Sequence, residues 1–281
     1  MRARSCFLFL VLFSILPVGS ASQKEHESHP KAFGIPTELL IEIIKETAKY
    51  AVAGVAGWLL IVVGDRWRTR RARPLFRPFL KEDLLIVVGR FEEFREWDPC
   101  GLMGVGDAFA LKELQKLLSR MGAREPKVVY ADRILSDGDE LKHPVIVLGG
   151  PDANAVTREF AMRIPSEFRF GDPSVNEVTI SDTAGTASRS FSPRVEEGRG
   201  VDYGLVVRAP NPLDPDKPMM ILAGAFGYGT WAAVRLLALP AFHKESKHIL
   251  KRPFEGLIRT EVIGDTPQRP TVVELRSLVK V

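Results

Sequence analysis

An apolar run that ends on a cluster of arginines constrains this chain more than any other feature. Residues 50–64 read YAVAGVAGWLLIVVG, and residues 65–73, DRWRTRRAR, follow at once. Counted from Thr47 to Gly64, the apolar segment has 18 residues including Lys49. This length is at the short end of what a helix needs to cross about 30 Å of hydrocarbon. The sequence therefore predicts a membrane span, with a buried helix of a soluble core as the alternative.

The distribution of charge around this segment favours the span. Residues 65–81 contain seven Lys or Arg opposed by Asp65 alone, whereas residues 23–49 contain four Lys and five Glu. Positive residues gather on the cytoplasmic side of membrane helices. We therefore expect a single-pass or two-pass protein of the cell membrane, with the basic segment 65–81 and the C-terminal domain in the cytoplasm.

The residues before the span indicate delivery to the membrane. Residues 1–22 combine two arginines, an apolar run and a small-residue stretch, which is typical of a signal peptide or a first anchor. Residues 23–36 are polar and are predicted to be an exposed linker. A helix over 37–64 should change from amphipathic to transmembrane, with lipid as its partner. Its small residues could also pair two copies of the chain into a homo-oligomer; they are Ala53, Gly54, Ala56 and Gly57.

The formal net charge of +4 does not predict a nucleic-acid partner. The first 73 residues hold 11 Lys or Arg and 6 Asp or Glu, and the remaining 208 residues hold 28 and 29. The positive charge therefore belongs to the leader and the membrane edge, where it attracts anionic headgroups. A nearly neutral body lacks the positive surface that binding to a phosphate backbone requires.

After the basic segment, short apolar runs alternate with helical patterns. The runs at 83–89, 127–131 and 144–148 are rich in β-branched residues and have the length of buried parallel strands. Leucines repeat at helical spacing over 108–121, and a further helix is expected to end at Arg163. This alternation predicts a sheet covered by helices on both faces.

Residues 82–281 are therefore predicted to form one α/β domain, a Rossmann-like three-layer sandwich with a mainly parallel sheet and an antiparallel C-terminal edge. Further strands are expected at 177–181, 203–208 and 219–223, a proline-rich turn at 209–218, a helix at 231–239 and the edge strands at 257–263 and 271–279. The polar stretch 182–201 has no apolar period, and the sequence leaves open whether it is a disordered loop or a functional lid.

Three glycine-containing turns precede helices and form the predicted ligand site. Glycines let a ligand approach backbone N–H groups, and a helix N-terminus favours an anion. In a doubly wound sheet such turns gather at the carboxyl ends of the strands. The alternative is that the glycines serve only helix entry and close packing. The predicted residues are Gly224, Gly227, Gly229 and Thr230 in one turn, Gly149, Gly150, Asp152 and Asn154 in the second, and Gly101, Gly104, Gly106 and Asp107 in the third.

The sequence gives weaker signals for chemistry. Asp132 ends the second predicted strand, where a ribose-binding acid could lie. Asp107, Asp132, Asp152 and Glu159 could each supply a general base, but a cap, a strand-end acid or a solvated helix face explains each of them better. The two cysteines and the scattered histidines make no metal-ligand pattern, and nothing indicates a cofactor.

The stretch HPVIVLGGPDANAVTREF, residues 143–160, resembles a motif of prokaryotic Rossmann-like domains. These include nucleotide-sensing domains of bacterial conflict systems and surface-layer domains of archaea. The resemblance covers about twenty residues and gives no catalytic residue. It implies a Rossmann-like fold, and its sensor members imply a nucleotide-derived ligand.

We therefore expect a membrane-anchored cytoplasmic domain that binds a small anionic ligand, a nucleotide being one candidate, as a sensor or regulatory module. Two alternatives stay open. One is a hydrolase acting on a nucleotide through one of the four acids, and the other is a structural module that docks a partner and has no ligand.

Overall fold

The computed structural model describes residues 37–91, 94, 96, 98–134, 138–172 and 178–278. The signal-peptide and linker predictions fall on residues 1–36 and lie outside this range. The chain divides into two units, residues 1–57 and residues 58–281. The helices are α2 (Thr37–Phe76), η1 (Arg77–Leu80), α3 (Val105–Arg120), α4 (Ala131–Ile134), η3 (Glu140–Lys142), α5 (Ala155–Arg163), α6 (Gly227–Leu237) and α7 (Pro240–Glu245). The strands are β1 (Leu85–Val88), β2 (Lys127–Tyr130), β3 (Val145–Leu148), β4 (Phe168–Phe170), β5 (Ile180–Asp182), β6 (Arg189–Phe191), β7 (Arg194–Glu196), β8 (Arg199–Asn211), β9 (Asp214–Gly224), β10 (Phe254–Ile263), β11 (Thr266–Pro267) and β12 (Thr271–Ser277).

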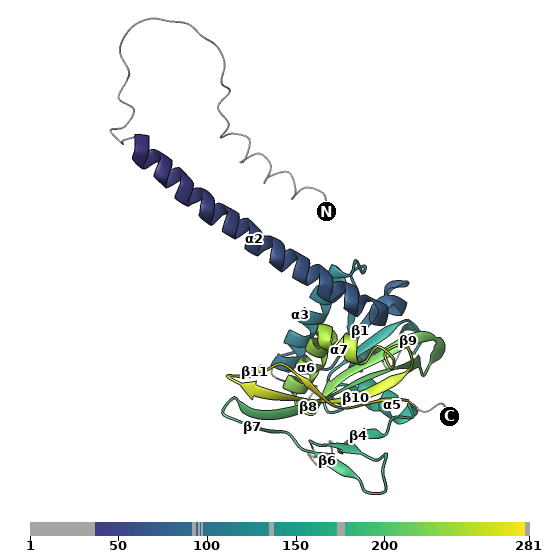
Figure 1. The fold of residues 1–281 in the computed structure, drawn as a ribbon. Coiled ribbons are helices and arrows are strands. Elements are labelled where there is room, and N and C mark those ends of the chain that lie inside the picture. The colour runs from purple at the N-terminus through teal and green to yellow at the C-terminus, as the bar shows by residue number, and fades with distance from the viewer. Residues whose placement is uncertain are drawn as a thin grey trace, which may run out of the picture. The chain divides into compact units, whose positions relative to one another are not determined.

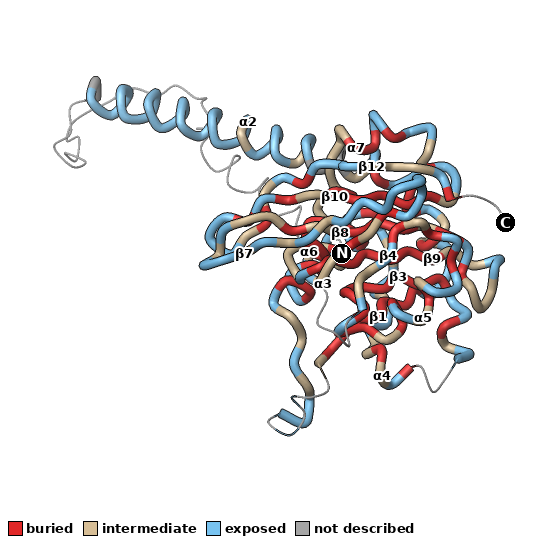
Figure 2. The backbone as a smooth tube through the Cα atoms, turned by 90° about the horizontal axis from the view of Figure 1, so that it is seen from below, coloured by how far each residue is buried: buried red, intermediate tan, exposed pale blue. Residues whose placement is uncertain are grey.

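Helix α2 contains the apolar run and continues through the arginine cluster. Its 40 residues include Pro74 near the C-terminal end. Within the described residues it is the one helix that is long and apolar enough to cross a membrane, with a mean hydropathy of 1.6 over its most apolar window. Figure 2 shows the apolar turns of α2 exposed, whereas the central strands of the domain, such as β1 and β3, are buried. Exposure of a continuous apolar surface is what a membrane span requires and is rare in a soluble helix.

The last turns of α2 belong to the α/β domain. Ala72, Leu75 and Phe76 are at most 2% exposed, and Phe79 of η1 is fully buried. These residues pack in one core with the inward faces of α3 and α6. The packed domain thus begins inside the segment that the sequence assigns to the basic edge of the membrane.

A mixed sheet of nine strands forms the centre of the domain. Strands β2, β1, β3 and β9 are parallel neighbours in that order, as alternation along the sequence predicted. The sheet then continues through β8 and β10 to β11 and β12 by antiparallel pairing. The antiparallel part is larger than the predicted edge, because β8 and β9 form a long hairpin across residues 209–218, where the sequence indicated only a turn.

Side chains of the central strands alternate between two apolar cores, as the pleat of a strand requires. Ile86 and Val88 face the core under α3, α6 and α7, whereas Leu85 and Val87 face the core under α5. Figure 1 shows these helices on opposite sides of the sheet. Both faces of β1 and β3 are therefore buried, which explains why these two parallel strands are short continuous apolar runs.

Parts of the polar stretch 182–201 form strands, namely β6, β7 and the start of β8, whereas residues 183–188 are loop. Residues of β6 pair with β5 in a separate three-stranded sheet, β4–β5–β6, and β7 pairs with β8 at the edge of the main sheet. The sequence missed these strands because their side chains are mostly exposed, and exposed short strands have no apolar period.

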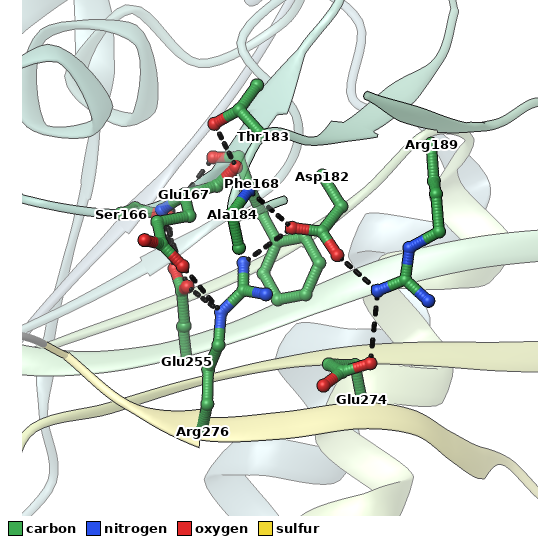
Figure 3. A network of polar contacts seen from close by, with 10 residues as sticks. All are labelled: Ser166, Glu167, Phe168, Asp182, Thr183, Ala184, Arg189, Glu255, Glu274 and Arg276. Carbon is green, nitrogen blue, oxygen red and sulfur yellow. Dashed lines mark hydrogen bonds and ion pairs between the residues drawn. The ribbon is translucent and has the colours of Figure 1, made fainter. Parts of the chain in front are cut away.

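A network of ion pairs joins the small sheet to the main sheet (Figure 3). Arg276 of β12 donates to the Asp182 carboxylate of β5 at 2.9 Å and to the Glu255 carboxylate of β10 at 2.6 Å. Arg189 also binds Asp182 and reaches Glu274 at 3.1 Å. Burial acts against the charge of Asp182, but hydrogen bonds from the two arginines outweigh it and lower its pKa to about 2.

Candidate functional site

The three predicted glycine turns meet at the carboxyl ends of β1, β3 and β9, which we call the carboxyl edge. A Cβ at Gly149 would lie 3.4 Å from the Asp107 carboxylate, and a Cβ at Gly150 would lie 2.8 Å from the backbone oxygen of Gly224. A Cβ at Gly104 would lie 3.3 Å from the same Asp107 carboxylate. Turns whose contacting residues are 42 and 74 positions apart in the sequence are therefore neighbours, as the fold class predicts.

Several of these glycines are explained by backbone packing alone. A Cβ at Gly106 would lie 2.3 Å from the carbonyl of Gly227, so the first turns of α3 and α6 touch through their backbones. A Cβ at Gly224 would lie 2.3 Å from the backbone nitrogen of Thr230, and one at Gly229 would lie 2.0 Å from the oxygen of Tyr203. Close packing, the alternative that the sequence left open, accounts for glycine at these positions without a ligand.

The N-terminus of α6 is already satisfied by an acid that sequence reasoning missed. Asp202 of β8 is fully buried, and its carboxylate accepts hydrogen bonds from the backbone N–H groups of Tyr203 at 2.7 Å, Phe226 at 3.2 Å and Gly229 at 2.5 Å. The N–H of Gly224 donates to the Thr230 hydroxyl at 2.9 Å. An internal carboxylate thus occupies the place that an anion would take at this helix end.

The N-terminus of α5 is capped in a similar way by Asn154. Its side-chain oxygen accepts from the N–H groups of Val156 and Thr157, at 3.0 and 3.2 Å, and its amide donates to the carbonyl of Leu148 at 2.7 Å. The Thr157 hydroxyl donates to the carbonyl of Gly149. Asn154 therefore ties the end of β3 to the helix that follows, and Asp152 beside it is exposed.

The N-terminus of α3 differs from the other two. Its N-cap, Gly104, provides no side-chain hydrogen bond. Asp107 is 5% exposed, and its Oδ1 atom has no hydrogen-bond partner among the described residues. Burial raises the pKa of Asp107 to about 6, the Thr230 side chain lowers it, and the charge of Asp152 raises it. Burial likewise raises the pKa of Asp202 to about 7. The three backbone hydrogen bonds to Asp202 lower this pKa, and the charge of Asp107 raises it further.

Asp132, the predicted ribose-binding acid, lies at the end of β2 and is engaged by Arg90. Arg90 is 4% exposed; its Nε donates to Asp132 at 2.9 Å and its Nη1 donates to the carbonyl of Cys100 at 2.8 Å. A ribose hydroxyl at Asp132 would compete with this buried ion pair. Cys100 itself is a free, exposed thiol.

A second site, which sequence reasoning missed, is a cavity of about 620 Å³ where the end of α2 meets β8 and the segment around α7. This volume is within the range of small-molecule sites. We call the cavity the basic pocket. Its lining consists of Arg71, Pro74, Leu75, Arg208, His243, Lys244, Lys247, Leu250 and Lys251.

The lining of the basic pocket carries an excess of positive charge. Five of its lining residues are Lys or Arg, and none of the residues named as its lining is acidic. Burial lowers the pKa of Arg208, whose Nη1 donates to the carbonyl of Leu250 at 2.7 Å, but an arginine remains charged at any physiological pH. Gathering like charges around one cavity destabilises the fold unless an anion neutralises them.

His243 adds a neutral donor or acceptor to the floor of the basic pocket. Its Nε2 lies 2.6 Å from the carbonyl of Leu237, which makes this nitrogen the protonated one of a neutral ring. Burial lowers the pKa of His243, and the positive charge of Arg71 lowers it further. The other ring nitrogen is then an acceptor unless a bound anion draws a second proton onto the ring.

A sequence signal for the basic pocket exists in HKESKHILKR, residues 243–252. Lys244, Lys247 and Lys251 follow one another at spacings of three and four residues, a spacing that indicates one side of a helix, but in the structure α7 ends at Glu245 and turns follow it. The signal does not include Arg71 or Arg208, because nothing in a sequence brings residues so far apart to one cavity.

The described residues contain no group of three or more potential metal ligands. No family model, no curated protein and no solved structure matches this chain. The geometry of the two sites is therefore the basis for the functional argument that follows.

Proposed function

We propose that this chain is a membrane-anchored module whose Rossmann-like α/β domain binds a small anionic, phosphate-bearing ligand and acts as a sensor or regulatory unit. The basic pocket is the observation that carries the proposal. It combines the volume of a small-molecule site with five cationic side chains and no acidic residue in its lining. A nucleotide is one ligand of this class.

Phosphate is the anion that fits these donors best. Arg71 and Arg208 come from two different elements, and guanidinium groups bind phosphate oxygens through paired N–H donors. Lys244, Lys247 and Lys251 have exposed side chains on flexible stems and can turn toward a ligand of variable size. Such a site would recognise charge and phosphate geometry, which suits a sensor.

The carboxyl edge supports an anionic ligand less well. The amide groups of α6 and α5 that sequence reasoning assigned to phosphate are engaged by Asp202 and Asn154. Asp107, Asp152 and Asp202 would also repel an anion whenever they are ionised. The edge keeps one feature of a ligand site, the unpartnered oxygen of Asp107, which calls for a donor such as a hydroxyl.

Anchoring and orientation are parts of the same proposal. The exposed apolar turns of α2 support insertion in a membrane, and the arginines that follow support a cytoplasmic position of the domain. The ligand would then be a cytoplasmic or membrane-surface compound.

The test is titration of the full chain in neutral detergent micelles with pyrophosphate and with ATP, followed by calorimetry and by the unfolding temperature. At a ligand concentration of about 100 times Kd we expect a stabilisation of about 2.7 kcal/mol, which corresponds to roughly 5 to 10 °C for a domain of this size. Binding should weaken as salt concentration rises, because the ions compete for the lysines.

The matched variants separate the basic pocket from general surface charge. The double variant Lys244→Gln/Lys247→Gln should lose most of the binding. Lys112→Gln/Lys116→Gln removes the same charge from exposed positions of α3 and should leave binding unchanged. Equal loss in both pairs, or no binding by any phosphate compound, would contradict the proposal.

A further inference from the structure

We infer that the phosphate recognised by the basic pocket belongs to an anionic phospholipid of the bilayer that anchors α2. The inference rests on the proposed function and specifies the source of its ligand. A free phosphate compound shares the same chemistry, so the experiment below includes both sources.

The position of the basic pocket along α2 is the first argument. Arg71 lies seven residues beyond Gly64, the end of the apolar run. At 1.5 Å per residue this separation is about 10 Å along the helix axis. The polar layer on each side of a bilayer is roughly 5 to 8 Å thick beyond the hydrocarbon. An arginine side chain spans the remaining distance, so the rim of the basic pocket lies within reach of lipid phosphates.

The direct attachment of the basic pocket to the end of α2 is the second argument. Leu75 is 2% exposed and Ala72 is fully buried in the domain core, while Arg71, Pro74 and Leu75 line the cavity. The same helical turns therefore pack into the domain core and contribute to the lining of the cavity. The cavity thus shares its lining with the helix that carries the apolar run.

The mixed character of the lining is the third argument. Pro74, Leu75 and Leu250 give the basic pocket an apolar part beside its cations. A lipid headgroup has this combination, because its phosphate is joined to a carbon skeleton. The number of cations favours a headgroup with a phosphomonoester, which carries up to two charges, over one with a single charge.

The lysines of the basic pocket are available for such a headgroup. Lys244, Lys247 and Lys251 are exposed and make no ion pair with any described residue. Residues 243–252 also contain His248 and Arg252, both exposed, and only one acid, Glu245. This segment thus carries an excess of exposed positive charge next to the lining of the basic pocket.

The experiment compares three nanodiscs that contain the full chain, with phosphatidylcholine alone, with added phosphatidic acid, and with added phosphatidylglycerol at matched total negative charge. Amide exchange of residues 240–252 reports occupancy, because a bound headgroup would hold this segment closed. We expect exchange about tenfold slower with phosphatidic acid, a smaller effect with phosphatidylglycerol and none with phosphatidylcholine. The slowing should disappear in Lys244→Gln/Lys247→Gln and persist in Lys112→Gln/Lys116→Gln.

A separate arm adds soluble glycerol phosphate to the phosphatidylcholine nanodisc. Protection by glycerol phosphate without protection by phosphatidic acid would overturn the lipid inference and leave the proposed function standing. Protection by neither would overturn both. Equal protection by the two anionic lipids, unchanged in the Lys244→Gln/Lys247→Gln variant, would also overturn the inference, because it would show attraction to surface charge without use of the basic pocket.

Discussion

Ionisation of the buried Asp107 carboxyl group at the carboxyl edge is unfavourable. Its pKa is raised from 3.8 to about 6, mainly by burial, and one carboxylate oxygen has no hydrogen-bond partner within the part of the chain that the structure describes. The folded state therefore binds more protons than the unfolded state between about pH 4 and pH 6. The contribution of Asp107 to the free energy of unfolding is highest below the pKa that this group has in the unfolded chain. It falls as pH rises through the pKa that the group has in the folded protein.

The variant Asp107→Asn should remove this pH dependence. We expect it to exceed the parent in free energy of unfolding by up to about 3 kcal/mol above pH 7, with the difference shrinking toward pH 4. Urea unfolding of the full chain in micelles at several pH values measures the effect. Glu125→Gln, which removes an exposed charge, serves as the control, and a parallel change in both variants would refute the explanation.

Arg276 stabilises the charges of buried acids, whereas the charge of Asp107 is not compensated. Glu255 and Asp182 are 1% and 2% exposed, and both bind this guanidinium. Replacement by methionine would leave two buried carboxylates short of a cation, and we expect Arg276→Met to cost roughly 3 to 5 kcal/mol. Arg189→Met removes an exposed partner of the same Asp182 and should cost about 1 kcal/mol or less. Equal costs in chemical unfolding would show that the network carries no buried charge.

At the element scale, the contact between α3 and α6 depends on a backbone approach that only glycine permits. A Cβ at Gly106 would lie 2.3 Å from the carbonyl of Gly227, whereas a Cβ at Gly138 would meet nothing within 4 Å. Gly106→Ala should therefore destabilise the domain by roughly 1 to 3 kcal/mol through forced separation of the two helices. Gly138→Ala should be nearly neutral, and unfolding temperatures of the two variants test the contrast.

The strands show which elements a sequence reveals and which it hides. β1 and β3 were predictable because burial on both faces makes each a continuous apolar run, whereas β2 is an apolar run with exposed or half-buried residues. The strands β6 and β7 were not predictable, because exposed short strands leave no pattern. The long β8–β9 hairpin was hidden by prolines that lie where the pairing shifts near Asn211.

At the scale of the whole molecule, the orientation in the membrane can be tested with the native thiol Cys100, which is exposed. In a Cys6→Ser background, a membrane-impermeant maleimide should label Cys100 only after the cells are opened, because the arginines after the span hold the domain in the cytoplasm. Labelling of Cys100 in intact cells would place the domain outside and refute the orientation.

The candidate sites also combine features that the local sequence predicts with features that depend on contacts between distant parts of the chain. The convergence of the glycine turns was predictable, since parallel strands bring their carboxyl ends to one edge. The cap of α6 was not: Asp202 lies on β8, 27 residues before Gly229, and it takes the place of the anion that the turn pattern indicated. The basic pocket was equally hidden, because Arg71, Arg208 and Lys247 come together only when α2 ends inside the domain core.

The most direct measurement of the central claim is the position of a heavy phosphate analogue. Crystals of the full chain grown in neutral detergent and soaked with tungstate should give an anomalous peak inside the basic pocket, within hydrogen-bonding distance of Arg71 or Arg208. Its height should fall in crystals of Lys244→Gln/Lys247→Gln. A peak at the N-terminus of α3 and none in the basic pocket, or no bound tungstate at all, would contradict the account.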